Sequence, residues 1–220
     1  MPGMSIPQET WYASAAGYLG MWMAMMLPMM LPALIPMLLR YRQAVRGAGE
    51  VRLHGLTAIV LICYLAVWAL VGLGAHAATA AFSAAEVRWA WIAGLVPVAS
   101  GLALVAAGAV QFTAWKARWL MLCRAEGGCD GRSDTRVLGA LHYGLRAGAR
   151  CSLCCGNLMV VLLVTGLMEP VAMLAVALAL SAERLAPAPL RVARASGVAI
   201  AGVGMATAMG LGGLASQWPR

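Results

Sequence analysis

The chain has 220 residues, of which 62% are hydrophobic and 11% are charged, and its formal net charge is +8. A soluble domain is about half apolar and about a quarter charged, so this composition predicts a membrane protein. The basic residues lie between apolar segments and not along one face, which argues against a nucleic-acid partner. The six cysteines do not indicate a disulfide-linked secreted domain, because the chain is too long and too apolar for one.

Six apolar segments have lengths near that of a membrane-spanning helix, which needs about 20 predominantly apolar residues. In chain order they lie at residues 14–39, 53–76, 87–112, 151–168, 170–185 and 195–215. Glu169 and Pro170 separate the fourth from the fifth, and proline suits the first turn of a helix. One helix of about 35 residues would be too long for a single span, so two spans are expected here. We therefore predict an all-α, polytopic membrane helix bundle of about six transmembrane helices, in one domain covering residues 1–220.

The basic residues predict the orientation of this bundle. All of them except Arg88 and Arg220 fall in the segments that follow the first, third and fifth spans. The positive-inside rule then places these segments in the cytoplasm and both termini outside, in a bacterial inner (plasma) membrane. The N-terminus has no basic segment before its first apolar run, so no cleaved signal peptide is expected. The largest cytoplasmic segment would be residues 113–150, with Ser133 and Asp134 capping a helix that continues into the fourth span.

The clearest candidate for chemistry is the string CSLCCGNLM at residues 151–159. Positions three and four apart on a helix lie on one face, with their Cβ atoms about 5–6 Å apart. The thiols of Cys151, Cys154 and Cys155 would therefore share one stripe, and Met159 continues it at the next turn. Thiolates and thioethers are soft donors that suit copper(I), so this spacing predicts a soft-metal site.

Other interpretations of these thiols remain open. Zinc usually takes four ligands in a closed tetrahedron, so a zinc site would need others such as Cys123, Cys129 or His142. Cysteine also packs as a small buried hydrophobe, which would leave the motif structural. A redox pair of Cys151 and Cys154 is a third interpretation, although the strand–helix context of a thioredoxin-like site is missing.

The first apolar segment carries a second candidate, the string GYLGMWMAMMLPMMLPALIPML. Met21, Met25 and Met29 recur every four residues, as do Met26 and Met30. Such thioethers could pass a soft cation along a helix, or they could fill irregular gaps in the packing. Prolines recur with the same spacing and remove backbone donors, which predicts a distorted helix; they are Pro28, Pro32 and Pro36.

Further soft and acidic residues lie near the ends of the later segments. Met168 precedes Glu169 at the break between the fourth and fifth spans, and Glu183 is followed by Arg184. Acids within a membrane are candidates for function by default, although Glu183 and Arg184 could form an ordinary interfacial ion pair. The loop CRAEGGCDG contains Cys123 and Cys129. These two thiols could hand a metal to a soluble carrier, or they could be spectator thiols.

Several strings together resemble a known bacterial family. They are WMAMMLPMMLPALIPML, CYLAVWALVGLGAH, GAVQFTAWK, LGALHYGLRAGARCSLCCGNLM, TGLMEPVAML and ALSAERLAP, in this order. They are similar to the predicted metal-binding integral membrane proteins known as the domain of unknown function 2182, over about residues 14–190. The resemblance implies a multi-span inner-membrane protein with a metal site. It would carry that role onto Cys151, Cys154, Cys155 and Met159, and less directly onto Met25, Met26, Gln111, Lys116, Cys123 and Glu183.

The chain departs from the family pattern at three places. Gly156 and Asn157 stand where the family commonly has an aromatic residue after the double cysteine. Glu169 stands where it commonly has asparagine, and Trp119 where it often has a cysteine. The core thiols are intact, so these departures concern the surroundings of the site and its cytoplasmic ligands.

We therefore expect a non-enzymatic, membrane-embedded protein that binds a soft metal, copper(I) before zinc, and transports or delivers it. The expected ligands are Cys151, Cys154, Cys155, Met159, Cys123, Met25, Met29 and Met168. The expected partners are the lipid bilayer and a metallochaperone or copper-enzyme subunit, without nucleic acid, and a homo-oligomer is compatible with the sequence. Two alternatives are a membrane thiol–disulfide oxidoreductase and a structural or assembly subunit of a membrane complex.

Overall fold

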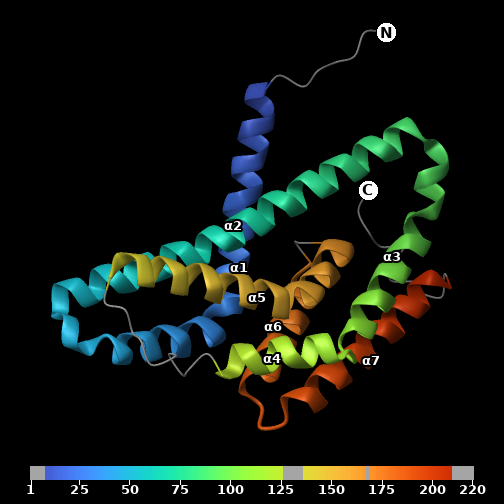
Figure 1. Cartoon of the computed structure of the whole chain (residues 1–220). Coiled ribbons are helices and arrows are strands. Elements are labelled where there is room, and N and C mark those ends of the chain that lie inside the picture. Colours follow the sequence, from blue (N-terminus) through green and yellow to red (C-terminus); the bar gives the residue numbers. More distant parts are fainter. Residues whose placement is uncertain (1–7, 126–135, 167–168, 210–220) are drawn as a thin grey trace.

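The computed structural model describes residues 8–125, 136–166 and 169–209, and within these ranges all regular structure is helical. The helices are α1 (Gln8–Ala44), α2 (Glu50–Arg88), α3 (Ala90–Val110), α4 (Ala114–Ala125), α5 (Val137–Thr165), α6 (Pro170–Leu185) and α7 (Pro189–Ala208), with a 3-10 turn at Arg46–Ala48. The predicted all-α class is confirmed for the described residues (Figure 1).

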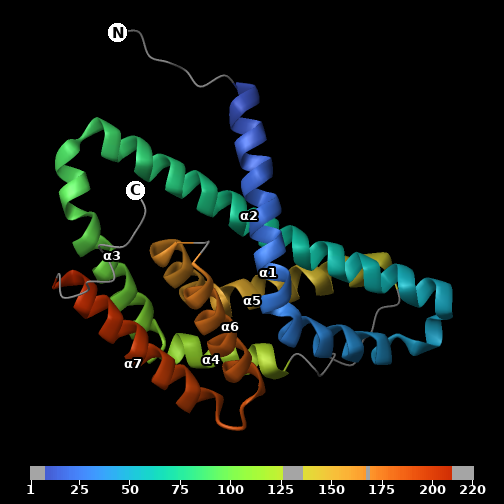
Figure 2. The same ribbon diagram turned by 180° about the vertical axis from the view of Figure 1, so that it is seen from behind.

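Helix α1 bends in its middle, and both views show this change of direction (Figures 1 and 2). Three prolines interrupt its hydrogen-bond ladder, at Pro28, Pro32 and Pro36. Each lacks a backbone N–H and crowds the carbonyl one turn earlier, which is the usual cause of a helix kink. The predicted distortion is confirmed, and α1 contacts both α2 and α6.

Glycines allow two helix pairs to pack closely. Helix α5 runs along α2 (Figure 1), and a Cβ added to Gly144 would lie 2.6 Å from the carbonyl oxygen of Val60. Helices α3 and α7 pack side by side, and a Cβ on Gly204 would lie 2.8 Å from the carbonyl oxygen of Gly101. Small residues at such crossings let backbones approach, as in membrane helix pairs.

The chain turns sharply between α3 and α4, with a bend of 62° across a short break. Gln111 ends α3, and Thr113 caps α4 because its hydroxyl accepts a hydrogen bond of 3.2 Å from the backbone N–H of Lys116. Helix α4 then packs against α5 and α6. The residues that were expected to form one cytoplasmic segment, 113–150, therefore contain α4 and the first half of α5.

The predicted break between the fourth and fifth apolar segments is confirmed. Gly166 ends α5 with a φ of 100°, a conformation that glycine adopts readily. Glu169 caps α6 by accepting a 2.7 Å hydrogen bond from the N–H of Ala172, and Pro170 occupies the first turn. The other predicted cap falls on residues 133 and 134, which lie outside the described ranges, and α5 begins at Val137 after Arg136.

Three described helices are long and apolar enough to cross a membrane, at Ala13–Ala44, Glu50–Arg88 and Val137–Thr165. A fourth is counted if the bent pair Gly94–Val110 and Ala114–Arg124 forms one span. The predicted number of six spans is not confirmed. Its boundaries also shift: residue 87 belongs to α2, and α7 begins before the predicted start at residue 195.

Candidate metal site

The three clustered cysteines lie on α5 with their side chains buried. Cys151, Cys154 and Cys155 are at most 4% exposed. Their spacing of three and four residues places them on the inward face of the helix, as the sequence predicted. Helix α5 packs against α2, α3, α4 and α6, so this stripe of thiols lies at the centre of the described structure.

Cys151 is the point where four helices meet. Its thiol points to the sulfur of Met30 on α1, with an Sγ–Sδ distance of 3.8 Å. The hydroxyl of Tyr64 on α2 donates a 3.1 Å hydrogen bond to the same thiol sulfur. The guanidinium of Arg184 on α6 donates to the sulfurs of Cys151, at 3.3 Å, and of Cys155, at 3.5 Å.

The thiols of α5 interact with one another and with a thiol of α4. Cys155 interacts with both Cys151 and Cys154, and Cys154 interacts with Cys123 on α4. The Cys123 thiol also donates to the carbonyl of Arg150, at 3.3 Å. With Met30 and Cys123, these are five sulfur-bearing side chains that interact in series, which we call the sulfur chain.

A small cavity adjoins the sulfur chain. It has a volume of about 20 Å³, which is room for one water-sized particle. Its lining combines soft donors with a hydroxyl and a cation, from residues Ala33, Met37, Tyr64, Cys123, Ala147, Cys151 and Arg184. Cys123 is only partly buried, whereas the three thiols of α5 are buried. Within the sulfur chain, Cys123 is therefore the thiol that is most accessible from outside the helix bundle.

The donor set fits a soft ion with few ligands. In the described ranges, no three Cys, His, Asp or Glu side chains are arranged to hold one metal ion together. A closed zinc site of four such ligands is therefore absent from this part of the chain. A pair of thiols beside a thioether is a different donor set, and sulfur ligands of both kinds favour copper(I).

The predicted ligands differ in how they relate to this arrangement. Cys151, Cys154, Cys155 and Cys123 belong to the sulfur chain, and Met159 is buried further along α5. Met25 and Met29 are buried on α1, but the methionine in contact with a thiol is Met30. Met168 lies outside the described residues. The four-residue spacing of the methionines therefore identified α1 correctly as the helix that faces the thiols. The contact with Cys151 comes from the stripe of Met26 and Met30 and not from that of Met25 and Met29.

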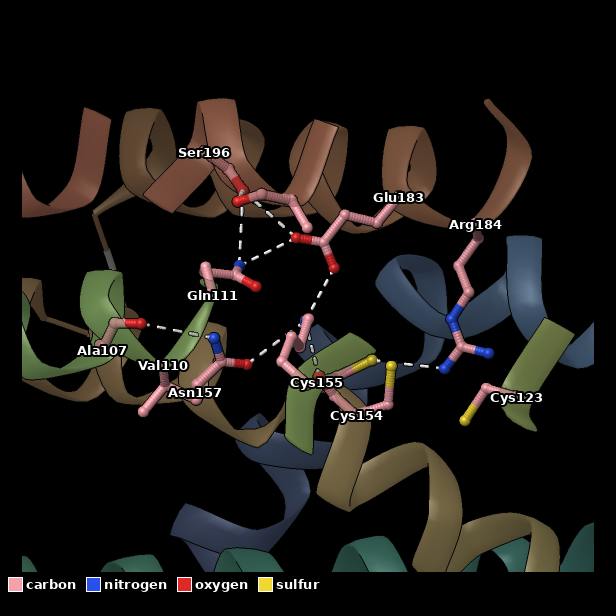
Figure 3. Close-up of polar contacts among 12 residues, drawn as sticks. Ala107, Val110, Gln111, Cys123, Cys154, Cys155, Asn157, Glu183, Arg184 and Ser196 are labelled. Atoms are coloured by element: carbon pink, nitrogen blue, oxygen red, sulfur yellow. Dashed lines mark hydrogen bonds and ion pairs between the residues drawn. The ribbon is translucent and has the colours of Figure 1, made fainter. Parts of the chain in front are cut away.

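A buried ion pair lies beside the thiols (Figure 3). Lys116 Nζ is 2.8 Å from Glu183 Oε2, and both side chains are almost fully excluded from solvent. Gln111 donates to the other carboxylate oxygen of Glu183 at 2.9 Å, and Ser196 donates to it at 3.2 Å. Glu183 therefore pairs with Lys116 and not with its neighbour Arg184, which corrects the simpler expectation of an interfacial pair.

The ion pair is connected to the thiol helix. Lys116 Nζ donates 2.8 Å to the carbonyl oxygen of Cys154 and lies 3.5 Å from the side-chain oxygen of Asn157. Asn157 is one of the two residues that stand where the family commonly has an aromatic residue, and here its side chain joins a polar network. A buried cation needs such partners, because an unpaired charge in an apolar interior is costly.

Sequence reasoning did not identify Tyr64 and Arg184 as contacts of the site, and it placed Met30 in a stripe of thioethers without naming it as a ligand. The only signal for Arg184 was its place in an acid-plus-base pair, and Tyr64 carried none beyond its apolar segment. Figure 3 shows Arg184 reaching from α6 towards the sulfur atoms of Cys154 and Cys155, with Cys123 close by on α4. These contacts join residues that are far apart in the chain, and local patterns do not report them.

Comparison with models of protein families gives a match for this sequence. The family model described as "PpoB2: Copper chaperone" matches residues 19–207, which include the whole sulfur chain. Comparison with curated proteins gives no match, and neither does comparison with solved structures. The match supports a copper-related family, and the role of a copper chaperone is not enzymatic, as expected. Because the match covers most of the sequence, the chain belongs to the PpoB2 copper chaperone family.

Proposed function

We propose that this protein is a membrane-embedded chaperone that holds copper(I) between Cys151, Cys155 and Met30. The observation that carries this proposal is the 3.8 Å contact between the sulfurs of Cys151 and Met30, beside a cavity of water-like size. Two helices that are distant in sequence bring a thiol and a thioether together there. A family of copper chaperones supplies the cargo that these donors suit.

Copper(I) is the oxidation state that this donor set favours. Sulfur ligands are soft and match the monovalent ion, whereas carboxylates and water suit hard cations. The acid nearest to the thiols, Glu183, is already paired with Lys116 and is not free to bind a metal. A site of two thiolates and one thioether therefore has the ligands for copper(I) and too few of the ligands that zinc prefers.

The rest of the sulfur chain would serve delivery. Cys154 contacts Cys155 on one side and Cys123 on the other, so a bound ion can move between thiols by exchanging one ligand at a time. Cys123 is partly exposed on the short helix α4. It is therefore the ligand at which a partner, such as a copper-enzyme subunit or a soluble metal carrier, would take or give the ion.

The surface supports a membrane location for this site. Three described helices are long and apolar enough to cross a membrane, and large apolar side chains on several helices are exposed. Among them Leu70 on α2, Trp91 on α3 and Val171 on α6 are each more than 60% exposed. Exposed apolar surface of this extent belongs in a lipid environment. We propose a multi-pass protein of the bacterial inner membrane, with the basic segments in the cytoplasm by the positive-inside rule.

The test is copper binding by the purified protein in detergent, under reducing conditions and in competition with a copper(I) chelator. We expect the wild type to retain copper(I) and the double variant Cys151→Ser/Cys155→Ser to lose it. Cys63→Ser is the matched control, because Cys63 is a buried thiol of α2 outside the sulfur chain. Equal copper retention by wild type and double variant would contradict the proposal.

A further inference from the structure

Arg184 is a cation in direct contact with the sulfurs of Cys151 and Cys155. A single guanidinium nitrogen, Nη2, donates to Cys151 and to Cys155, at 3.3 and 3.5 Å. Arginine stays protonated in proteins, so this contact is a permanent positive charge beside the two proposed ligands.

The surrounding contacts hold Arg184 in this place. Its neighbour Glu183 is fixed by the ion pair with Lys116. Arg124, in the last turn of α4, donates to the backbone carbonyls of Glu183 at 3.2 Å and of Arg184 at 2.7 Å. The end of α6 is therefore attached to α4 at two points, and the Arg184 side chain is directed across to α5 (Figure 3).

The charges around the site do not cancel that of Arg184. The Lys116 ammonium is matched by the Glu183 carboxylate at 2.8 Å. Among the described residues, no carboxylate forms an ion pair with Arg184. Among the groups that the structure describes, the charge of Arg184 is therefore balanced when the thiols that it contacts are ionised, as they are when they bind a metal.

We propose that Arg184 makes this site selective for a monovalent soft cation, an inference that rests on the proposed function. When Cys151 and Cys155 bind a metal, each releases its proton to solvent and becomes a thiolate. Two thiolates and one guanidinium leave a single negative charge, which a monovalent ion neutralises. A divalent ion would leave a net positive charge among buried apolar side chains, where uncompensated charge is unfavourable. Met30 is neutral and does not change this balance.

The test compares two soft ions of different charge on the full-length protein in detergent: silver(I), which mimics copper(I) without redox chemistry, and cadmium(II). Arg184→Gln removes the charge and keeps a hydrogen-bonding amide, and Arg184→Lys keeps the charge. We expect Arg184→Gln to shift the ratio of the two affinities towards cadmium(II) by about tenfold or more. Arg184→Lys should stay closer to the wild-type ratio.

Arg191→Gln is the control, because this exposed arginine in the first turn of α7 is absent from the contacts of the site. It should leave the ratio unchanged. If the wild type binds silver(I) and Arg184→Gln keeps the wild-type ratio, the selectivity role is wrong and the proposed function stands. If the wild type binds neither ion, the proposed function itself is wrong, and this inference fails with it.

Discussion

The thiol sulfur of Cys151 on α5 lies 3.8 Å from the thioether sulfur of Met30 on α1, across 121 positions of the chain. This contact joins the two soft-donor motifs of the sequence, the clustered cysteines and the methionine-rich first helix. Its position beside the cavity lined by Tyr64 and Arg184 makes it the starting point for the predictions that follow.

Replacing Met30 by leucine should weaken copper(I) binding by about tenfold, because a ligand is lost while the volume of the side chain is nearly kept. The measurement is a chelator competition on protein in detergent. Met29→Leu is the matched control on the same helix, and it should have a much smaller effect. An equal loss in both variants would show that the methionines act on the site only through packing.

Cys123→Ser should retain bound copper(I) but release it more slowly to a soluble thiol acceptor. The reason is position: Cys123 is partly exposed, whereas Cys154 behind it is buried. The measurement is the rate of transfer from the loaded protein to excess glutathione, followed by the loss of sulfur-to-copper absorption. A variant that releases copper at the wild-type rate would exclude Cys123 as the exchange ligand.

Lys116→Met should destabilise the protein by about 3–5 kcal/mol, since it leaves the buried carboxylate of Glu183 without its partner. Thermal unfolding in detergent measures this loss. The double variant Lys116→Met/Glu183→Gln removes the charge on both sides and should recover part of the stability. If the double variant is less stable than Lys116→Met, the pair is not the cause of the loss.

Gly144→Ala should separate α2 from α5 and destabilise their packing by about 1–3 kcal/mol, because the new Cβ would lie 2.6 Å from a backbone oxygen. Gly156→Ala, on the same helix, is the control. A Cβ at Gly156 meets no atom within 4 Å, so alanine there should be neutral or slightly stabilising. Thermal unfolding of both variants measures the cost of filling the close approach at Gly144, and equal stability of the two variants would contradict the prediction.

A thiol–disulfide oxidoreductase, the enzyme alternative considered from the sequence, would form a reversible disulfide between Cys151 and Cys154. We expect none under mild oxidation of the copper-loaded protein. The five described cysteines are free thiols, and Cys151 contacts Met30 and Cys155. Mass spectrometry of alkylated peptides provides the measurement, and a stoichiometric Cys151–Cys154 disulfide would revive the redox role.

Local chemistry made much of the structure predictable from the sequence. Apolar runs of helical length predicted an all-α chain, and repeated prolines predicted the distorted α1. Proline at residue 170 predicted the start of α6, because it lacks the N–H that a first turn does not use. The number of membrane spans was not predictable in the same way. Hydropathy reports length and composition, but it does not say whether a bent pair such as α3 and α4 crosses once.

At the site, local spacing is enough to place Cys151, Cys154 and Cys155 on one helix face, because a helix has 3.6 residues per turn. The partners that face them follow from the packing of the helices: Met30 and not Met29, Tyr64 from α2, Arg184 from α6 and Cys123 from α4. Those contacts depend on the close crossing at Gly144 and on the two hydrogen bonds from Arg124 to the end of α6. Both are products of packing between distant segments, which no local spacing encodes, whereas the bend of α1 follows from its own prolines.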